Sequence, residues 1–216
     1  MLQLKSKGLL FIVALLSVFT FACIIAFKSL LNTDELVYNF YAEQLAQRQI
    51  EELLETQQKW AWIGYAIVPV IIVLRTSLVA TCLSIGLFFY DMEHKLKFNS
   101  FFRVALMGEF VLVLVGFVKL GYFLFIKTTY TLQDIQQYYP LSYTNFLDLN
   151  KIEPWLIYPL QTINLFEIAY FFVLVVGLQK LLSNSFSKSV EITAVSYGSG
   201  LLIWMGLVMF LTLNFT

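Results

Sequence analysis

The sequence predicts an all-α protein: a polytopic integral membrane helical bundle of five transmembrane helices, with the N-terminus inside and the C-terminus outside. The first observation is composition, because 59% of the 216 residues are hydrophobic and only 13% are charged, unlike an average soluble domain. The second is that five apolar stretches each have about the 20 residues that cross a bilayer. The third is the distribution of basic residues, which favours one orientation.

Composition and motifs argue against several classes of function. The formal net charge is zero, so the chain has no basic footprint for nucleic acid. The two cysteines, Cys23 and Cys82, lie inside apolar stretches and predict neither a disulfide framework nor a metal site. The sole histidine, His94, lies in a connection, and no nucleophile is paired with a base. We therefore expect no enzyme activity, no metal and no cofactor.

The first expected span covers residues 9–31 and follows a positively charged start. Such a start is also typical of a secretory signal peptide. The apolar run is longer than a typical signal core, however, and no clear A-x-A cleavage site follows it. We therefore expect an uncleaved membrane anchor.

Residues 33–60 are polar, favour a helix and contain no Pro or Gly, so we expect one helix outside the membrane. Asn32, followed three residues later by Glu35, forms an N-cap pattern at its start. Apolar residues recur along it at roughly helical spacing, so one face is suited to the membrane surface or to a partner. A solvated helical linker is the alternative interpretation.

The second span, residues 62–90, carries Arg75 near its middle. A charge near the bilayer midplane costs from about 2.5 to more than 10 kcal/mol, so it normally faces the bundle interior, water or an opposite charge. Pro69 removes a backbone donor and predicts a kink in the helix before Arg75. The small residues Ser77 and Thr81 predict close packing against a neighbouring helix.

The third span, residues 101–126, contains Glu109 and Lys119. If the second and third spans are antiparallel, the rise per residue places Arg75 and Glu109 within about one helical turn of each other in depth. We therefore expect an Arg75–Glu109 ion pair. The pair either fixes the register of the two helices or belongs to a pathway through the membrane.

Residues 127–162 are not expected to cross the membrane, because three prolines and scattered polar residues interrupt them. Their many aromatic side chains suit the headgroup region and predict a folded loop against the membrane surface, or alternatively a lid over a cavity. These aromatic residues are Tyr130, Tyr138, Tyr139, Tyr143, Phe146, Trp155 and Tyr158.

The fourth span covers residues 163–182 and holds Glu167 near its start; the fifth covers residues 190–213. Glu167 and Lys119 are expected at comparable depth near the same membrane face, so they form a second candidate ion pair. The candidate site is therefore a buried charge network of Arg75, Glu109, Lys119 and Glu167.

Basic residues set the expected orientation. A cytoplasmic N-terminus places these residues inside: Lys5, Lys7, Lys95, Lys97, Arg103, Lys180 and Lys188. The opposite side keeps Lys28, Arg48, Lys59, Lys127 and Lys151, together with the acidic helix. The positive-inside rule then favours an N-in, C-out protein, which we expect in a bacterial cytoplasmic (inner) membrane.

The hairpin NLFEIAYFFVLVVGLQKLLSNSFSKSVEITAVSYGSGLLIW, residues 164–204, resembles the C-terminal helical hairpin of Yip1-type membrane proteins. The shared elements are an F-E entry, a Gly late in one span, a short Ser/Lys turn and a final span of small residues. The five-span count also resembles that family. Because eukaryotic members act as scaffolds in membrane trafficking, the resemblance implies a scaffold role.

Two functions from different classes fit these features. The first is a non-enzymatic scaffold or accessory subunit of a membrane complex, which lies in the lipid bilayer and binds a protein partner or forms a homo-oligomer. The second is a small transporter, channel or pore-forming effector lined by the buried charges, because intramembrane ionisable groups are candidates for function. The chain shows no internal repeat of the kind that many transporters carry.

Overall fold

The computed structural model describes residues 6–42, 44–90 and 96–215, and all long elements within them are helices, so the predicted all-α class is confirmed. The helices are α1 (Ser6–Leu30), α2 (Thr33–Tyr41), α3 (Gln47–Phe89), α4 (Phe98–Phe125), α5 (Leu132–Gln137), α6 (Pro154–Thr162), α7 (Leu165–Leu182) and α8 (Phe186–Phe215). Two short 3-10 helices, Tyr143–Phe146 and Leu149–Lys151, lie between α5 and α6. Three residues named above lie outside the described ranges: Lys5, His94 and Lys95.

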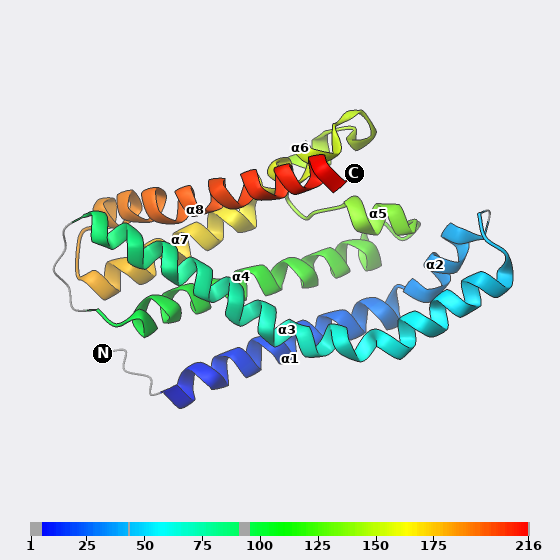
Figure 1. Ribbon diagram of the computed structural model, residues 1–216, viewed down its shortest axis with the longest axis horizontal. Coiled ribbons are helices and arrows are strands. Elements are labelled where there is room, and N and C mark those ends of the chain that lie inside the picture. Colours follow the sequence, from blue (N-terminus) through cyan, green and yellow to red (C-terminus); the bar gives the residue numbers. More distant parts are fainter. Residues whose placement is uncertain (1–5, 43, 91–95, 216) are drawn as a thin grey trace.

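Five helices of the described chain are long and apolar enough to cross a membrane, a property typical of integral membrane proteins. They are Lys7–Leu30, Gln47–Phe88, Phe98–Phe125, Leu165–Leu182 and Phe186–Phe215. Successive members run in opposite directions, so that α1, α4 and α8 begin at the end of the bundle where α3 and α7 finish (Figure 1). We term the end of the bundle where α1, α4 and α8 begin the amino end, and the opposite end the lobe end.

The bundle is organised around α4, which packs against α1, α3 and α7. Apolar side chains at helical spacing supply these contacts, because each helix buries the stripe that faces its neighbours. The largest buried cluster joins α3, α4, α7 and α8 and includes Leu83, Phe101, Leu174 and Ile192. A smaller cluster of Leu16, Ile72 and Leu106 attaches α1 to α3 and α4.

Glycines allow the closest helix contacts. A Cβ added at Gly108 of α4 would lie 2.5 Å from the ring of Tyr170 on α7, so the two helices meet there only because residue 108 has no side chain. A Cβ at Gly86 of α3 would lie 2.1 Å from the Cβ of Ser196 on α8. These two positions bring α7 and α8 against the α3–α4 pair.

The second half of α3 packs on protein, as the sequence predicts, but through another face. Thr76 and Ala80 are fully buried. The hydroxyls of Ser77 and Thr81 instead donate to carbonyls four residues earlier in the same helix, and Thr81 is exposed. One residue of difference turns a side chain by about 100° around a helix, so a small-residue pattern alone does not give the contact face.

The structure divides residues 33–60 differently from the single polar helix expected. α2 ends at Tyr41, and α3 starts at Gln47 and continues through the expected second span to Phe89, as one helix of 43 residues. The start of α3 is capped by Gln49, whose side-chain oxygen accepts a hydrogen bond from the Ala46 amide at 3.1 Å. No residue with low helix propensity separates its polar part from its apolar part, so the helix does not end at the change in composition.

Pro69 lies inside α3, and the helix continues on both sides of it. Figure 1 shows that α3 changes direction along its length. The kink at Pro69 itself stays a prediction.

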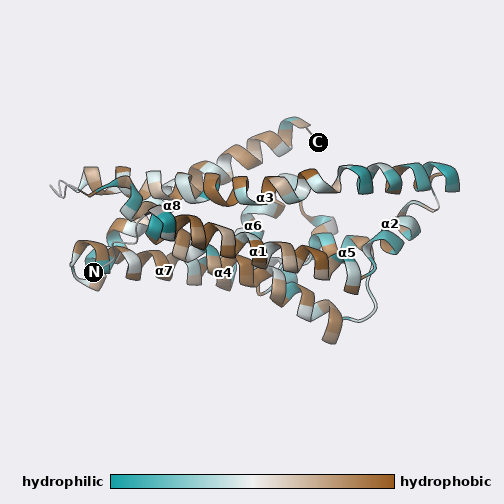
Figure 2. Ribbon diagram, turned by 90° about the horizontal axis from the view of Figure 1, so that it is seen from below, coloured by the Kyte–Doolittle hydropathy of each residue, from teal (hydrophilic) through white to brown (hydrophobic). Residues whose placement is uncertain are grey.

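At the lobe end, residues 47–59 of α3 extend beyond the bundle beside α2 (Figure 1). Their ribbon is hydrophilic, whereas the bundle is mostly hydrophobic (Figure 2). We term α2, residues 47–59 of α3 and α5 the polar lobe.

Residues 127–162, where a folded loop is expected, contain short helices, and none of those described is long enough to be a candidate span. This segment is attached to the bundle. The indole Nε1 of Trp204 on α8 donates to the Tyr158 hydroxyl of α6 at 2.8 Å. Asn164 caps α7 by accepting a hydrogen bond from the Glu167 amide at 2.7 Å.

Candidate polar site within the bundle

The predicted Arg75–Glu109 ion pair is confirmed. Arg75 donates from Nε to both carboxylate oxygens of Glu109, at 3.1 Å each, and also from Nη2 to Oε2. A guanidinium that engages both oxygens fixes orientation as well as distance, so the pair sets the relation between α3 and α4. Its two members differ in exposure, because the side chain of Glu109 is 0% exposed and that of Arg75 is 45% exposed.

The second candidate pair is wrong, because Glu167 bonds with a tyrosine instead of Lys119. Oε1 of Glu167 accepts a hydrogen bond from the Tyr197 hydroxyl of α8. Tyr170 lies against Gly108, so Glu167, three residues earlier on an antiparallel helix, is level with about residue 111 of α4. Lys119 is eight residues further along α4, about 12 Å at 1.5 Å per residue.

The reason for this error is the depth at which α7 begins. The sequence predicts that the fourth span starts at the level where the third span ends. In the structure α7 has 18 residues and α4 has 28, so the first turn of α7 does not reach the end of α4. Glu167 therefore lies close to the level of Glu109.

Lys119 has no hydrogen bond or ion pair with the residues that the structure describes. It precedes the last residue of α4, Phe125, by six positions, or about 9 Å. A lysine stem extends along apolar surface and places its ammonium nearer the end of the helix. The structure thus separates Lys119 from the other three charged residues.

Two tyrosines complete the cluster of Arg75, Glu109 and Glu167. The rings of Tyr170 and Tyr197 pack with their centroids 5.4 Å apart. Tyr170 is 1% exposed, and its hydroxyl has no hydrogen-bond partner among the described residues. That hydroxyl lies close enough to interact electrostatically with the charges of Arg75, Glu109 and Glu167. We term the set of Arg75, Glu109, Glu167, Tyr170 and Tyr197 the bundle cluster.

Two further tyrosines, from the segment between α4 and α7, lie near the same charges. Burial raises the pKa of Tyr139, the Glu167 carboxylate raises it further, and the Arg75 guanidinium opposes the rise. Burial also raises the pKa of Tyr158, and the hydrogen bond from Trp204 opposes that rise. Both tyrosines therefore lie within electrostatic range of the bundle cluster, and α6 also packs against α8.

Sequence reasoning missed Tyr170 and Tyr197 as members of the site. Tyr170 follows Glu167 by three residues and so lies on the same face of α7. That spacing was the available signal. Tyr197 had no such signal, because only the packing of α8 on α7 brings it to Glu167.

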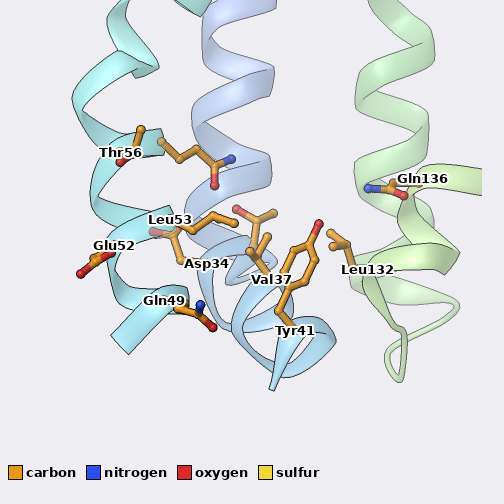
Figure 3. Close-up of a pocket in the computed structure, with 11 residues that line it drawn as sticks. Asp34, Val37, Tyr41, Gln49, Glu52, Leu53, Thr56, Leu132 and Gln136 are labelled. Carbon is orange, nitrogen blue, oxygen red and sulfur yellow. The ribbon is translucent and has the colours of Figure 1, made fainter. Parts of the chain in front are cut away.

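A second candidate site is a groove in the polar lobe, between α2, α3 and α5, with a volume of about 830 Å³ (Figure 3). Its apolar lining residues are Val37, Tyr41, Leu53 and Leu132. Its charged lining residues are Asp34 and Glu52, both acidic. The groove is wide enough for a ligand or for side chains of a partner.

In the described ranges, no three His, Cys, Asp or Glu side chains form a group that could hold a metal ion. Comparisons of the chain with protein-family models, curated proteins and solved structures find no match. Function is therefore inferred from the residues of the chain itself.

Proposed function

We propose that this chain is an integral membrane protein that acts as a non-enzymatic scaffold or accessory subunit of a membrane complex. The observation that supports this proposal most directly is the polar lobe. Nearly every residue of α3 from 51 to 60 is exposed or half-exposed, and the helix extends beyond the bundle. A helix that is polar on most of its surface is suited to bridging to another domain or protein.

The bundle cluster supports a structural role for its charges. Arg75 and Glu109 join α3 to α4, and the hydrogen bond between Tyr197 and Glu167 joins α8 to α7. Polar pairs of this kind specify which helices pack together and in which register. A bundle with a fixed register is a stable base for a projecting binding surface.

The proposed topology places the N-terminus in the cytoplasm and the polar lobe on the opposite side of a bacterial cytoplasmic membrane. Cysteines introduced at Glu52 and Phe146 should react with a membrane-impermeant maleimide added to intact cells, and a cysteine at Lys97 should react only after permeabilisation. The side chain of Glu52 is 63% exposed and Phe146 is 86% exposed, so reactivity there reports sidedness rather than burial. The reverse labelling pattern would reject this orientation.

The scaffold role is tested by what copurifies with the full chain in mild detergent. We expect a foreign protein in stoichiometric amount, identified by mass spectrometry. A triple variant of the lobe, Glu51→Lys with Glu52→Lys and Glu55→Lys, should lose it. The control Asp148→Lys removes an exposed carboxylate that is paired with Lys151 three residues away, outside the lobe, and should keep the partner. Purification of a homo-oligomer alone, unaffected by either variant, would contradict the proposal.

A transporter or channel is the second candidate, and one observation favours it. Arg75 is half-exposed although its partner is fully buried, so part of the Arg75 side chain is open to lipid or water. If the cluster lines a pathway, the purified chain should conduct ions in liposomes, and the Glu167→Gln variant should change that flux. Absence of flux from well-folded protein would reject this candidate.

A further inference from the structure

The groove of the polar lobe combines an apolar floor with acidic groups. Figure 3 shows Val37 and Tyr41 of α2 between Leu53 of α3 and Leu132 of α5. Asp34 lies beside Val37 in the same view. A ligand for this surface must therefore offer apolar side chains to the floor and hydrogen-bond donors to the edge.

The charge of the lobe is negative, although the whole chain is neutral. Residues 32–59 include six acidic and two basic residues, whereas the chain has 14 of each. Glu35, Glu51 and Glu55 form no ion pair within the described residues. The lobe therefore attracts a basic partner electrostatically and repels an acidic one.

The two charged lining residues already have basic partners, but these contacts are weak. Lys28 Nζ lies 3.3 Å from Oδ2 of Asp34, and Arg48 Nε lies 3.2 Å from Oε1 of Glu52. All four side chains are at least 42% exposed. Exposed pairs contribute about 0 to 1 kcal/mol. Lysine or arginine from another protein can therefore replace them at little cost.

The shape of the groove suits a helix. Gln49, Leu53 and Thr56 line it at i, i+4 and i+7, so it follows one face of α3 for about two turns, or about 10 Å. α2 forms the floor along much of that length, between α3 and α5. Amphipathic helices bind such grooves through apolar residues at the same spacing.

We propose that this groove binds a basic amphipathic helix of a partner protein, with its apolar face on Val37, Tyr41 and Leu53 and its Lys or Arg side chains against Asp34 and Glu52. This inference rests on the proposed scaffold role, which assigns the polar lobe to a partner. It adds the place of contact and the chemistry of the partner.

The test uses the full chain in nanodiscs of phosphatidylcholine and two fluorescent peptides of about 18 residues with identical apolar faces, one basic and one acidic. Fluorescence anisotropy should show binding of the basic peptide at least about tenfold tighter than binding of the acidic peptide. Empty nanodiscs measure the binding of each peptide to lipid alone, and this binding is subtracted.

Two groove variants test the charge of the groove and the space within it. The double variant Glu52→Lys with Leu53→Lys places positive charge in the groove, and Gln57→Trp fills it from an exposed position. Each should weaken binding of the basic peptide about tenfold or more, which corresponds to about 1.4 kcal/mol. The control Asp148→Lys should leave it unchanged. Because Gln57 is exposed, its variant keeps the test valid even if the double variant disturbs the lobe.

Three results would overturn the inference: no binding of either peptide, equal binding of both, or binding that the groove variants do not weaken. A Gln57→Cys variant tests a second copy as the occupant, because a disulfide-linked dimer absent from the wild type would also overturn it. The two proposals can fail separately. If neither peptide binds but the triple lobe variant still loses a copurified partner, the scaffold role is supported and only the helix-binding groove is rejected.

Discussion

Two arginine–glutamate pairs of this chain lie in opposite surroundings. Arg48 and Glu52 are neighbours on one helix of the polar lobe, with side chains 89% and 63% exposed. Arg75 and Glu109 join two helices of the bundle, and the glutamate is 0% exposed. The exposed pair is screened by water and contributes about 0 to 1 kcal/mol, whereas breaking a buried pair costs about 3 to 5 kcal/mol. The comparison shows that position, rather than the type of pair, decides what a charge contributes.

The largest expected effect comes from breaking the buried pair. Arg75→Ala should destabilise the bundle by about 3 to 5 kcal/mol, because it leaves the fully buried Glu109 carboxylate without its guanidinium. Thermal unfolding in mild detergent should show a much lower midpoint, whereas Arg48→Ala, the matched change in the lobe, should shift it little.

The exchanged double variant sharpens this result. Arg75→Glu combined with Glu109→Arg should recover most of the lost stability, because the opposite charges are restored at the same place. Replacement of both by apolar residues, Arg75→Met with Glu109→Leu, should be neutral or stabilising, because no charge remains to be desolvated. Single variants as stable as the wild type would show that the pair is not structural.

The next effect compares glycines inside and outside the close helix contacts. Gly108→Ala should destabilise by about 1 to 3 kcal/mol, because the added Cβ would lie 2.5 Å from the Tyr170 ring. Gly64→Ala should be neutral or slightly stabilising, since no described atom lies within 4 Å of that Cβ and alanine favours a helix by up to about 1 kcal/mol. Equal effects in an unfolding titration would mean that α4 and α7 are not in close contact.

A smaller effect separates two buried hydroxyls of the bundle cluster. Tyr197→Phe should cost about 1 to 2 kcal/mol, because it removes the hydrogen bond to Glu167 and leaves a carboxylate oxygen without that donor. Tyr170→Phe should be neutral or stabilising, because its hydroxyl has no partner among the described residues. Unfolding midpoints that fall in the opposite order would contradict the geometry of the cluster.

The smallest effect belongs to an ion pair that joins α5 of the polar lobe to the preceding segment, and it depends on pH. Lys127, whose Nζ lies 2.6 Å from Asp134 Oδ1, lowers the pKa of Asp134 in the folded state, and the Thr131 amide lowers it as well. The stabilisation is therefore complete above the unfolded pKa of about 3.9 and is lost as the pH falls below it through the lower folded pKa. The protection factors of amides 131–138, which correct for the intrinsic pH dependence of hydrogen exchange, should fall in that window by an amount equivalent to less than about 1 kcal/mol. Asp134→Asn should remove the pH dependence, and an unchanged profile would reject this assignment.

Much of the fold follows from local properties of the sequence. Apolar length gives the five long helices, and antiparallel neighbours with a known rise give the Arg75–Glu109 pair. Both estimates depend only on consecutive elements. The pairing of Glu167 failed because the depth of α7 depends on the short helices before it, which no apolar pattern describes.

The other errors have the same origin in packing. Residues 47–89 form one helix because a change from polar to apolar residues carries no signal that ends a helix. Tyr197 joins the bundle cluster because α8 packs on α7, and the same helix brings Ser196, the neighbouring residue, against Gly86 of α3. Such contacts between distant segments leave no periodic pattern in the sequence.

The continuity of α3 has a mechanical consequence. No loop separates the start of the helix at Gln47 from Arg75, a length of about 42 Å along the helix axis. A load on the polar lobe therefore acts as a torque on the bundle, with the contact between Tyr65 of α3 and Phe21 of α1 near the fulcrum. The part of α3 from Gln47 to Tyr65 is about 27 Å long, so tilting it by about 10° moves its tip by about 5 Å. A small rotation between α3 and α1 is thus amplified into a larger displacement of whatever the lobe holds.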